Sequence, residues 1–360
     1  MVPALSGDGY PEFLRQYRLN AWEAFESLPM PTTSEEAWRR TDLRGLNPAS
    51  YRLPAASDSA NLPQAPAELL HPIADEAYGG QVLLLPGKVE ATLDPKWAAK
   101  GVVFTDLATA GRQHPELLER ILGKVVRPSE GKFAALAGAL AQLGVLLYVP
   151  RNVRLDQPLQ SILWGPGAGL AYISHLLVCV EDGASLTYVH EAASPDDSSG
   201  QTLESSGGRT LNPSSGQTLH AGLVEIHVGA GAHLRFVELQ SWGSHVWNFS
   251  HERARVQRDG NLDWIFGALG SRLTKNFSDL DLLGEGSSGR MSGFYFTNGD
   301  QHMDLDTQQN HLAPHTTSDL LYKGALKDRS RSVWQGMIYV APGAQKTDGY
   351  QANRNLTLSP

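Results

Sequence analysis

Cysteine is almost absent from this sequence, since Cys179 is the only one in 360 residues. The chain can therefore form no internal disulfide, and it cannot build a Cys-rich metal site alone. Cys179 lies in an alternating apolar run, with no base or cation beside it in sequence. A reactive thiolate needs such a neighbour, so a small buried apolar role is favoured for this residue.

Positive charge and long hydrophobic runs are also scarce. The sequence has 30 Lys and Arg residues and 38 Asp and Glu residues, which gives a formal net charge of −8. This balance argues against a nucleic acid or an anionic membrane as the main partner. No apolar run approaches the roughly 18 residues of a membrane-spanning helix. The first residues lack a basic and an apolar segment, so no signal peptide is predicted and we expect a cytoplasmic protein.

Charged residues are few and glycine is abundant. Charged residues make up 19% of the chain and glycine 36 of 360 residues, against usual shares of about 25% and about 7%. Such a composition is typical of a turn-rich β protein. Hydrophobic residues make up 41% of the chain, which is enough for a large core and excludes wholesale disorder.

Residues 1–143 are predicted to form a mainly helical α+β domain. Apolar residues at steps of three and four predict a helix over residues 10–28, which Pro29 and Pro31 end. A Pro-Gly turn between two apolar runs predicts a pair of strands over residues 81–94. The remaining predicted elements are a strand over residues 101–107 and helices over residues 114–125 and 130–143.

Residues 144–360 are predicted to form an all-β region, because short alternating runs replace the helical pattern. A motif of the form Gly-(Ala)-x-Leu-x-aromatic begins at four glycines, and the last two starts are 29 residues apart. Spacings in the twenties are typical of a β-solenoid, in which each turn stacks on the next. Ordinary hairpin turns in a β-sandwich are the alternative. The four motif starts are Gly167, Gly183, Gly231 and Gly260.

The polar segment 194–219 interrupts this pattern. It holds three near-copies of a Ser-Ser-Gly-(Gln/Gly-Arg)-Thr-Leu string and almost no apolar residues. We interpret it as a low-complexity surface insertion that grew by duplication. A functional lid is the less favoured alternative.

Few residues have the spacing of a catalytic or metal site. The sequence has neither a His-Glu-x-x-His nor a His-x-His motif, and His311 and His315 alone supply too few ligands for a metal. Asp279 with Asp281, and Asp304 with Asp306, could serve as the paired carboxylates of a glycoside or polyuronate enzyme. Solvent-facing alternate positions of a strand are the favoured interpretation of these aspartates.

The most distinctive residues lie near the end of the chain. Alternating strands are followed by the amides of Gln345, Gln351, Asn353 and Asn355, which could form side-chain ladders between stacked turns. Three strings here resemble the SufB/SufD family of iron–sulfur cluster assembly proteins, most closely its SufD branch. They are Lys323-Gly-Ala-Leu-Lys-Asp-Arg-Ser, Val333-Trp-Gln-Gly-Met-Ile and Ala344-Gln-Lys-Thr-Asp-Gly-Tyr-Gln-Ala-Asn-Arg-Asn-Leu. Near the other end, Glu36-Ala-Trp-Arg-Arg-Thr-Asp42 resembles the N-terminal motif of the same family.

The resemblance implies a right-handed parallel β-helix behind an N-terminal helical domain. It also implies a non-catalytic scaffold subunit of a SUF-type complex, with iron–sulfur clusters handled by the assembled complex and no cofactor held by this chain alone. The implied partners are a SufB-like subunit or a second copy, paired through the β-helix, and a SufC-like ATPase. Candidate partner-interface residues are His311, His315, Lys323, Gln345, Lys346, Asp348, Gln351 and Asn355.

The sequence also departs from the family pattern. Ala137 stands where the family usually has Asn, and no segment matches the C-terminal helical domain that contacts the ATPase in the family. The ATPase contact therefore transfers to no residue here. We expect the solenoid end near Pro360 to be covered by a partner, a second copy or a further segment. A carbohydrate-active β-helix enzyme and a pure self-assembly module are the alternative functions.

Overall fold

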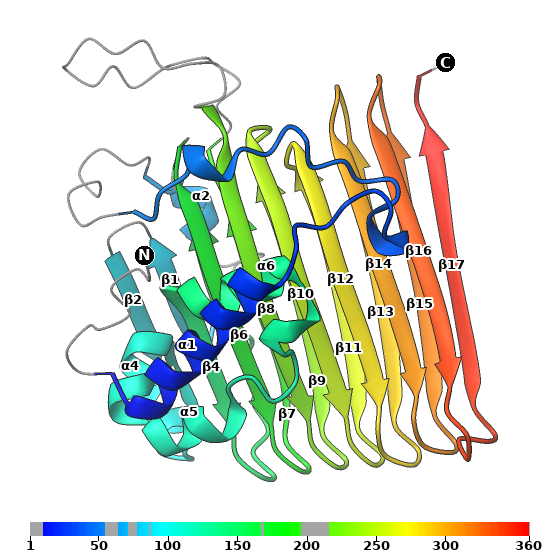
Figure 1. Ribbon diagram of the computed structural model, residues 1–360. Helices are drawn as coiled ribbons and strands as arrows, with labels where there is room; N and C mark the ends of the chain where they lie inside the picture. Colours follow the sequence, from blue (N-terminus) through cyan, green and yellow to red (C-terminus); the bar gives the residue numbers. More distant parts are fainter. Residues whose placement is uncertain are drawn as a thin grey trace.

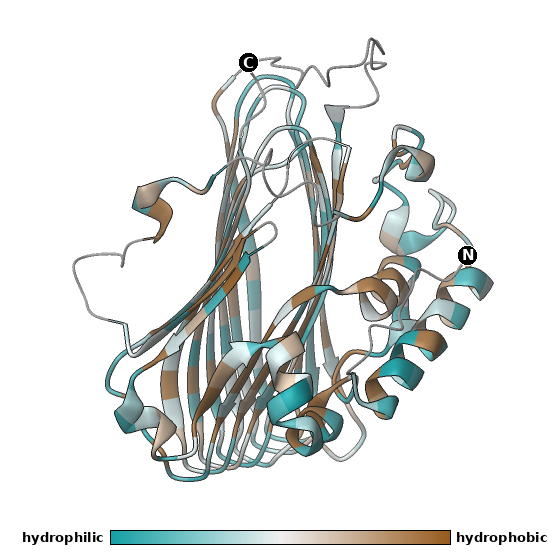
Figure 2. Ribbon diagram, turned by 90° about the vertical axis from the view of Figure 1, so that its left-hand side faces the viewer, coloured by the Kyte–Doolittle hydropathy of each residue, from teal (hydrophilic) through white to brown (hydrophobic). Residues whose placement is uncertain are grey.

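Two facing β-sheets form the body of the molecule (Figures 1 and 2). The computed structural model describes residues 10–54, 64–70, 78–85, 88–165, 167, 169–195 and 216–359. Within these ranges the chain passes from one sheet to the other at nearly every strand, so that odd-numbered strands gather in one sheet and even-numbered strands in the other from β4 onward. The architecture is a parallel β-solenoid with helices beside it, which confirms the predicted fold class.

The nine-stranded sheet contains, in spatial order, β17 (Asp348–Thr357), β15 (Thr317–Leu326), β13 (Ser288–Thr297), β11 (Asn261–Gly270), β9 (His233–Trp242), β7 (Ser185–Ala193), β5 (Leu159–Trp164), β1 (Gly80–Leu85) and β2 (Lys88–Leu93). The eight-stranded sheet contains β16 (Arg331–Val340), β14 (His302–His311), β12 (Leu273–Leu282), β10 (Val246–Val256), β8 (Thr218–Val228), β6 (Ala171–Val180), β4 (Leu143–Val149) and β3 (Val103–Asp106). Only the β1–β2 and β3–β4 pairs are antiparallel among these strands.

Three of the four motif copies occupy equivalent places in the solenoid. The copies at Gly183 and Gly231 place these glycines in turns with φ of 67° and 61°, a backbone region that favours glycine. They lead into β7 and β9, and the next copy leads into β11. The motif aromatics Tyr188, Phe236 and Trp264 lie in register, with ring centroids 5.6 and 5.9 Å apart. The copy at residue 167 instead precedes β6, in the other sheet.

The N-terminal part combines helices with strands that extend the two sheets. Helix α1 (Glu12–Ser27) matches the prediction over residues 10–28, and the strand pair over residues 81–94 is the β1–β2 hairpin. Strands β1 and β3 lie next to β5 and β4, so this part shares both sheets with the solenoid. The domain boundary at residues 143/144 stays a prediction. The other helices are η1 (Glu36–Trp38), η2 (Pro48–Ser50), α2 (Ala67–Leu70), α3 (Pro95–Ala98), α4 (Leu107–Gln113), α5 (Pro115–Ile121), η5 (Pro128–Glu130) and α6 (Lys132–Leu140).

Helices α1 and α6 lie outside the eight-stranded sheet (Figure 1). Helix α6 packs its apolar face on this sheet, where Phe133 stacks on Phe249 of β10 with ring centroids 3.7 Å apart. Trp38 of η1 closes the same cluster against both rings. Two hydrophobic layers result, one between the sheets and one beneath the helices.

Most of the predicted insertion 194–219 lies outside the described residues, since description stops at residue 195 and resumes at residue 216. Thr218 and Leu219 already belong to β8, so the insertion as predicted overlaps the start of a core strand. In the described ranges, no helix combines the length and the apolar character needed to cross a bilayer.

Candidate functional site

The two sheets end differently at the two ends of the stack. At one end, β2 and β3 are short strands of 6 and 4 residues that pair antiparallel with their neighbours. At the other end, β16 and β17 are each 10 residues long and pair on one side only within the described part of the chain. Long unpaired edges are ready to accept a further strand. We call β16, β17 and the turn between them the terminal turn.

Apolar side chains are exposed on the terminal turn. Leu356 and Tyr350 of β17 are 61% and 51% exposed, and Met337 of β16 is 56% exposed. Tyr339 and Val340 lie beside Met337 on β16 and are also exposed. Exposed apolar side chains beside a free strand edge are available for contact with another protein.

The free edge of β17 can be assigned residue by residue. The N–H of Asp348 donates to Thr316 O, just before β15, over 3.0 Å, and the N–H of Leu358 donates to Leu326 O, at the end of β15, over 2.7 Å. Along a strand, the backbone N–H groups of successive residues point alternately to one side and to the other. Between Asp348 and Leu358, every second N–H therefore points away from β15. The N–H groups on the free edge are therefore those of Gly349, Gln351, Asn353, Asn355 and Thr357.

Polar side chains line the inside of the solenoid at this end. Tyr295 OH donates to Asn355 Oδ1 over 2.6 Å, which places one of the predicted amides in a contact between stacked turns. Gln351 Oε1 and Trp334 Nε1 are buried and have no hydrogen-bond partner among the described residues. Buried polar atoms without a hydrogen bond reduce the stability of a fold. A further polar group that bonds to these two atoms would therefore stabilise this end of the solenoid.

The two predicted histidines lie in different environments. His311 is fully buried, with Nδ1 2.7 Å from Thr316 Oγ1 and Nε2 2.8 Å from Ser318 Oγ. Burial lowers the pKa of His311 below its usual range, so this imidazole is a neutral structural group. His315 lies in the turn before β15, exposed, with Nε2 4.0 Å from Glu285 Oε1. His311 thus serves a structural role within this chain, and its contact with a partner stays a prediction.

The other predicted interface residues gather in the last turns of the solenoid. Lys323 is exposed on β15, and Gln345 and Lys346 are exposed in the turn between β16 and β17. Asp348 and Asn355 are exposed on β17, where Gln351 is partly buried. The structure brings these residues to one end, and their contact with a partner stays a prediction.

The four aspartates of the enzyme alternative serve structural roles. Asp304 is fully buried, where Oδ1 accepts from Lys275 Nζ over 2.9 Å and Oδ2 accepts from Thr41 Oγ1. Asp279 forms an ion pair with Arg253, and Asp281 accepts from Asn310 Nδ2 over 2.8 Å. Burial raises the pKa of Asp306 to about 6. No polysaccharide can reach a buried, paired carboxylate such as Asp304, so the carbohydrate-active alternative is not supported.

The motif around Trp38 anchors the N-terminal loop to the solenoid. Thr41 Oγ1 lies 2.9 Å from His302 Nε2 and also bonds Asp304. Lys275, on the neighbouring strand β12, places its ammonium 5.8 Å from the Trp38 ring centroid. Sequence reasoning missed Lys275, although a lysine in an alternating strand next to aromatic and acidic residues was an available signal.

Glu225 is a second anchor that sequence reasoning missed. This fully buried carboxylate of β8 accepts the backbone N–H groups of Gly123, Val125 and Val126 over 2.8, 2.6 and 3.1 Å. His175 Nε2 lies 2.8 Å from the same carboxylate. Glu225 thus fixes the loop after α5 on the outer face of the eight-stranded sheet.

Cys179 is buried in β6, as predicted. Burial raises the pKa of its thiol to about 12, so the thiolate is not populated near neutral pH. Within the described residues, no group of three or more His, Cys, Asp or Glu side chains is arranged to hold a metal ion.

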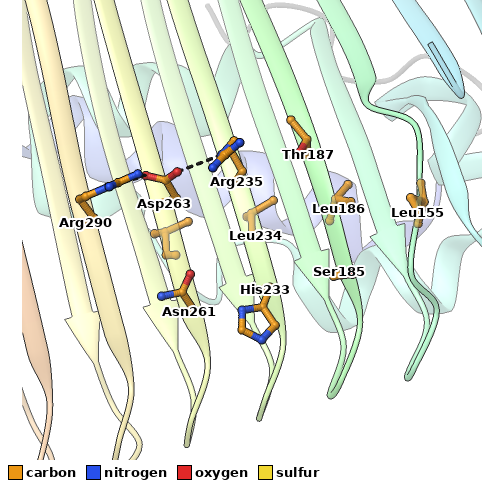
Figure 3. A pocket seen from close by; sticks show the side chains of 11 residues that line it. Leu155, Ser185, Leu186, Thr187, His233, Leu234, Arg235, Asn261, Asp263 and Arg290 are labelled. Atoms are coloured by element: carbon orange, nitrogen blue, oxygen red, sulfur yellow. Dashed lines mark hydrogen bonds and ion pairs between the residues drawn. The ribbon is translucent and has the colours of Figure 1, made fainter. Parts of the chain in front are cut away.

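A shallow pocket lies on the nine-stranded sheet, across β7, β9, β11 and β13. Figure 3 shows Asp263 between the guanidinium groups of Arg235 and Arg290, each 2.9 Å from one of its oxygens in the ion pairs. Leu155 and Leu186 line the same pocket. The carboxylate of Asp263 on β11 thus binds one arginine on each neighbouring strand. We conclude that the charged residues of this pocket stabilise the sheet.

The fold and the terminal turn together define a class of protein: a parallel β-solenoid with a helical N-terminal cover and one open end. The family model described as SUF system FeS cluster assembly, SufBD core domain, matches residues 164–360, and the SufBD protein N-terminal region matches residues 6–161. The chain therefore belongs to the SufBD family of iron–sulfur cluster assembly proteins.

Curated relatives agree with this assignment. An iron-sulfur cluster assembly SufBD family protein of Staphylococcus saprophyticus is 28% identical over 352 residues, which cover 95% of this chain and 71% of the relative. Proteins with the same description from Staphylococcus haemolyticus and Staphylococcus aureus are 28% and 27% identical over the same shares of both chains.

Proposed function

We propose that this chain is a non-catalytic subunit of a SUF-type complex that pairs with a SufB-like subunit through its terminal turn. The observation that carries the proposal is the pair of free, 10-residue edges of β16 and β17 with exposed apolar side chains. A partner strand added at such an edge would satisfy the backbone groups and cover the apolar surface. The family of the chain supplies the process, which is iron–sulfur cluster assembly.

The non-catalytic role is supported by how the ionisable residues are used. The buried aspartate Asp304 and the buried glutamate Glu225 both bind neighbouring elements of the same chain. The single thiol is protonated by burial. We therefore propose that the cluster is cargo of the assembled complex, with ligands supplied largely by partner subunits, including a SufC-like ATPase that acts on the complex.

A cytoplasmic location belongs to the same proposal. Iron–sulfur assembly depends on reduced thiols, which the cytosol maintains and oxidising compartments do not. Neither a nucleic acid nor a membrane is required for pairing through the terminal turn.

The experiment is co-expression of the chain with a SufB-like subunit from the same cell, followed by affinity capture and size-exclusion chromatography with light scattering. Asn353→Pro removes one free-edge N–H without removing a bond of the β15–β17 ladder. Asn353→Ala is the matched control, because it loses the side chain but keeps that N–H. We expect capture by the parent chain and by Asn353→Ala, and at least about tenfold weaker capture by Asn353→Pro.

A second pair of variants tests the apolar surface. Leu356→Lys places a charge on the terminal turn, whereas Val89→Lys places one at the opposite end of the same sheet, on a residue that is 42% exposed. Only Leu356→Lys should reduce capture. Formation of a homodimer in place of the heterodimer would identify a second copy as the partner, and equal capture by all four variants would refute pairing through this end.

A further inference from the structure

A concave cavity of about 540 Å³ lies where the loop after η1 crosses the starts of β12, β14 and β16. We call it the arginine cavity. Five arginines line it, together with two aspartates and His302: they are Arg40, Arg44, Arg272, Arg329 and Arg331. Arg40 and Arg44 belong to the loop, and adjacent turns of the solenoid supply the other three, because His302 N donates to Arg272 O and Arg331 N donates to Gln301 O.

The arginine cavity carries an excess of positive charge in a chain that is acidic overall. Asp42 forms an ion pair with Arg44, and Asp300 forms one with Arg329, with Nε and Oδ1 2.8 Å apart. The other three arginines make no side-chain hydrogen bond or ion pair with a described residue, although Arg272 is close enough to help lower the pKa of Asp300. Five arginines and two aspartates leave three positive charges without partners.

Trp247 forms part of the remaining wall of the cavity. Trp247 is 4% exposed, and its Nε1 has no hydrogen-bond partner among the described residues. Its ring lies against Gly45, where an added Cβ would be 3.2 Å from an indole carbon. Burial lowers the pKa of His302, so this imidazole is neutral at pH 7 and adds no charge. The excess charge therefore comes from guanidinium groups alone.

Guanidinium groups bind phosphate oxygens through two parallel hydrogen bonds, and several of them can surround one polyanion. A volume of this size suits a small molecule. The formal charge of −8 for the whole chain disfavours a long nucleic acid. We propose that the arginine cavity binds a small ligand that carries a pyrophosphate or triphosphate group.

The test is isothermal titration calorimetry of the full chain with pyrophosphate, and with citrate as a carboxylate polyanion. We expect pyrophosphate to bind with a Kd below about 1 mM, and citrate to bind at least about tenfold more weakly. Arg272→Gln and Arg331→Gln should each weaken pyrophosphate binding at least about tenfold. Arg258→Gln is the matched control, because Arg258 is an exposed arginine beside Asp259, in the turn between β10 and β11.

Circular dichroism and the thermal midpoint of each ligand-free variant show whether its fold is intact, and unchanged values make the affinities comparable. The proposal is overturned by no measurable heat with pyrophosphate, or by an equal loss of affinity in Arg258→Gln. Equal affinity for citrate would overturn the phosphate assignment. Binding of a 12-nucleotide single strand more tightly than pyrophosphate would overturn the assignment to a small ligand.

Discussion

The paired carboxyl groups of Glu238 and Glu252 make the stability of the solenoid depend on pH. Both side chains are buried between the sheets and hydrogen-bond to each other. Glu252 also accepts from Asn276 Nδ2 over 2.6 Å and from Ser278 Oγ over 3.1 Å. Burial raises the pKa of Glu238 well above its usual range and the pKa of Glu252 to about 7.

A carboxyl group with a higher pKa in the folded chain keeps its proton after the unfolded chain has lost it. The free energy of unfolding therefore falls as pH rises from the unfolded pKa to the folded pKa. For Glu252 this window runs from the ordinary glutamate pKa of 4.5 to about 7. A difference of this size corresponds to a loss of about 3 kcal/mol above the window.

Glu252→Gln keeps the size of the side chain and removes its titration. We expect the variant and the parent chain to differ by less than about 1 kcal/mol at pH 5, and the variant to be more stable by about 3 kcal/mol at pH 8. Urea unfolding followed by far-ultraviolet circular dichroism between pH 5 and pH 8 measures this difference.

The buried histidines His190, His220 and His251 have pKa values lowered by burial, so they reduce stability as pH falls below about 6.5. They are present in both proteins, and their effect cancels in the difference. Parallel stability curves for the two proteins across the pH range would refute the assignment of this dependence to Glu252.

Two further changes test packing and the N-terminal anchor. Lys275→Met should destabilise the chain by about 3–5 kcal/mol, because Asp304 would remain buried without its cation. A restored urea midpoint in the double variant Lys275→Met/Asp304→Leu would confirm this cause. An unchanged urea midpoint in Lys275→Met alone would contradict it. Gly270→Ala should lower the thermal midpoint far more than Gly299→Ala, since both have positive φ but only the Cβ at residue 270 meets a backbone atom, Trp242 O at 1.7 Å. Equal shifts would show that backbone conformation alone decides the cost.

Elements defined by local patterns could be predicted from the sequence. The periodicity of α1, the Pro-Gly turn of the β1–β2 hairpin and the repeated glycine turns before β7, β9 and β11 are all properties of neighbouring residues. The repeat of these glycine turns also predicted that successive turns of the chain stack on one another. These local signals sufficed for the fold class because each turn of a solenoid contacts mainly its neighbours.

Contacts between distant residues could not be predicted in the same way. Thr41 and Asp304 are 263 positions apart, and no local pattern shows that one hydroxyl and one carboxylate meet. The arginine cavity draws on a loop near residue 42 and on three later turns, so its charge is visible only after folding. His311 was selected from the sequence as an interface candidate, and no local pattern shows that its ring is buried in β14 between Thr316 and Ser318.

The difference between the two ends of the stack bears on stoichiometry. A solenoid that could add strands at both ends would grow into a filament, as head-to-tail contacts do when they fail to close. Here the β2 end is short, antiparallel and charged, with Lys88 beside Glu90, whereas the terminal turn is long and open. Growth in one direction stops once two open ends meet. Under the proposed pairing through the terminal turn, assembly by strand addition would therefore end at a pair.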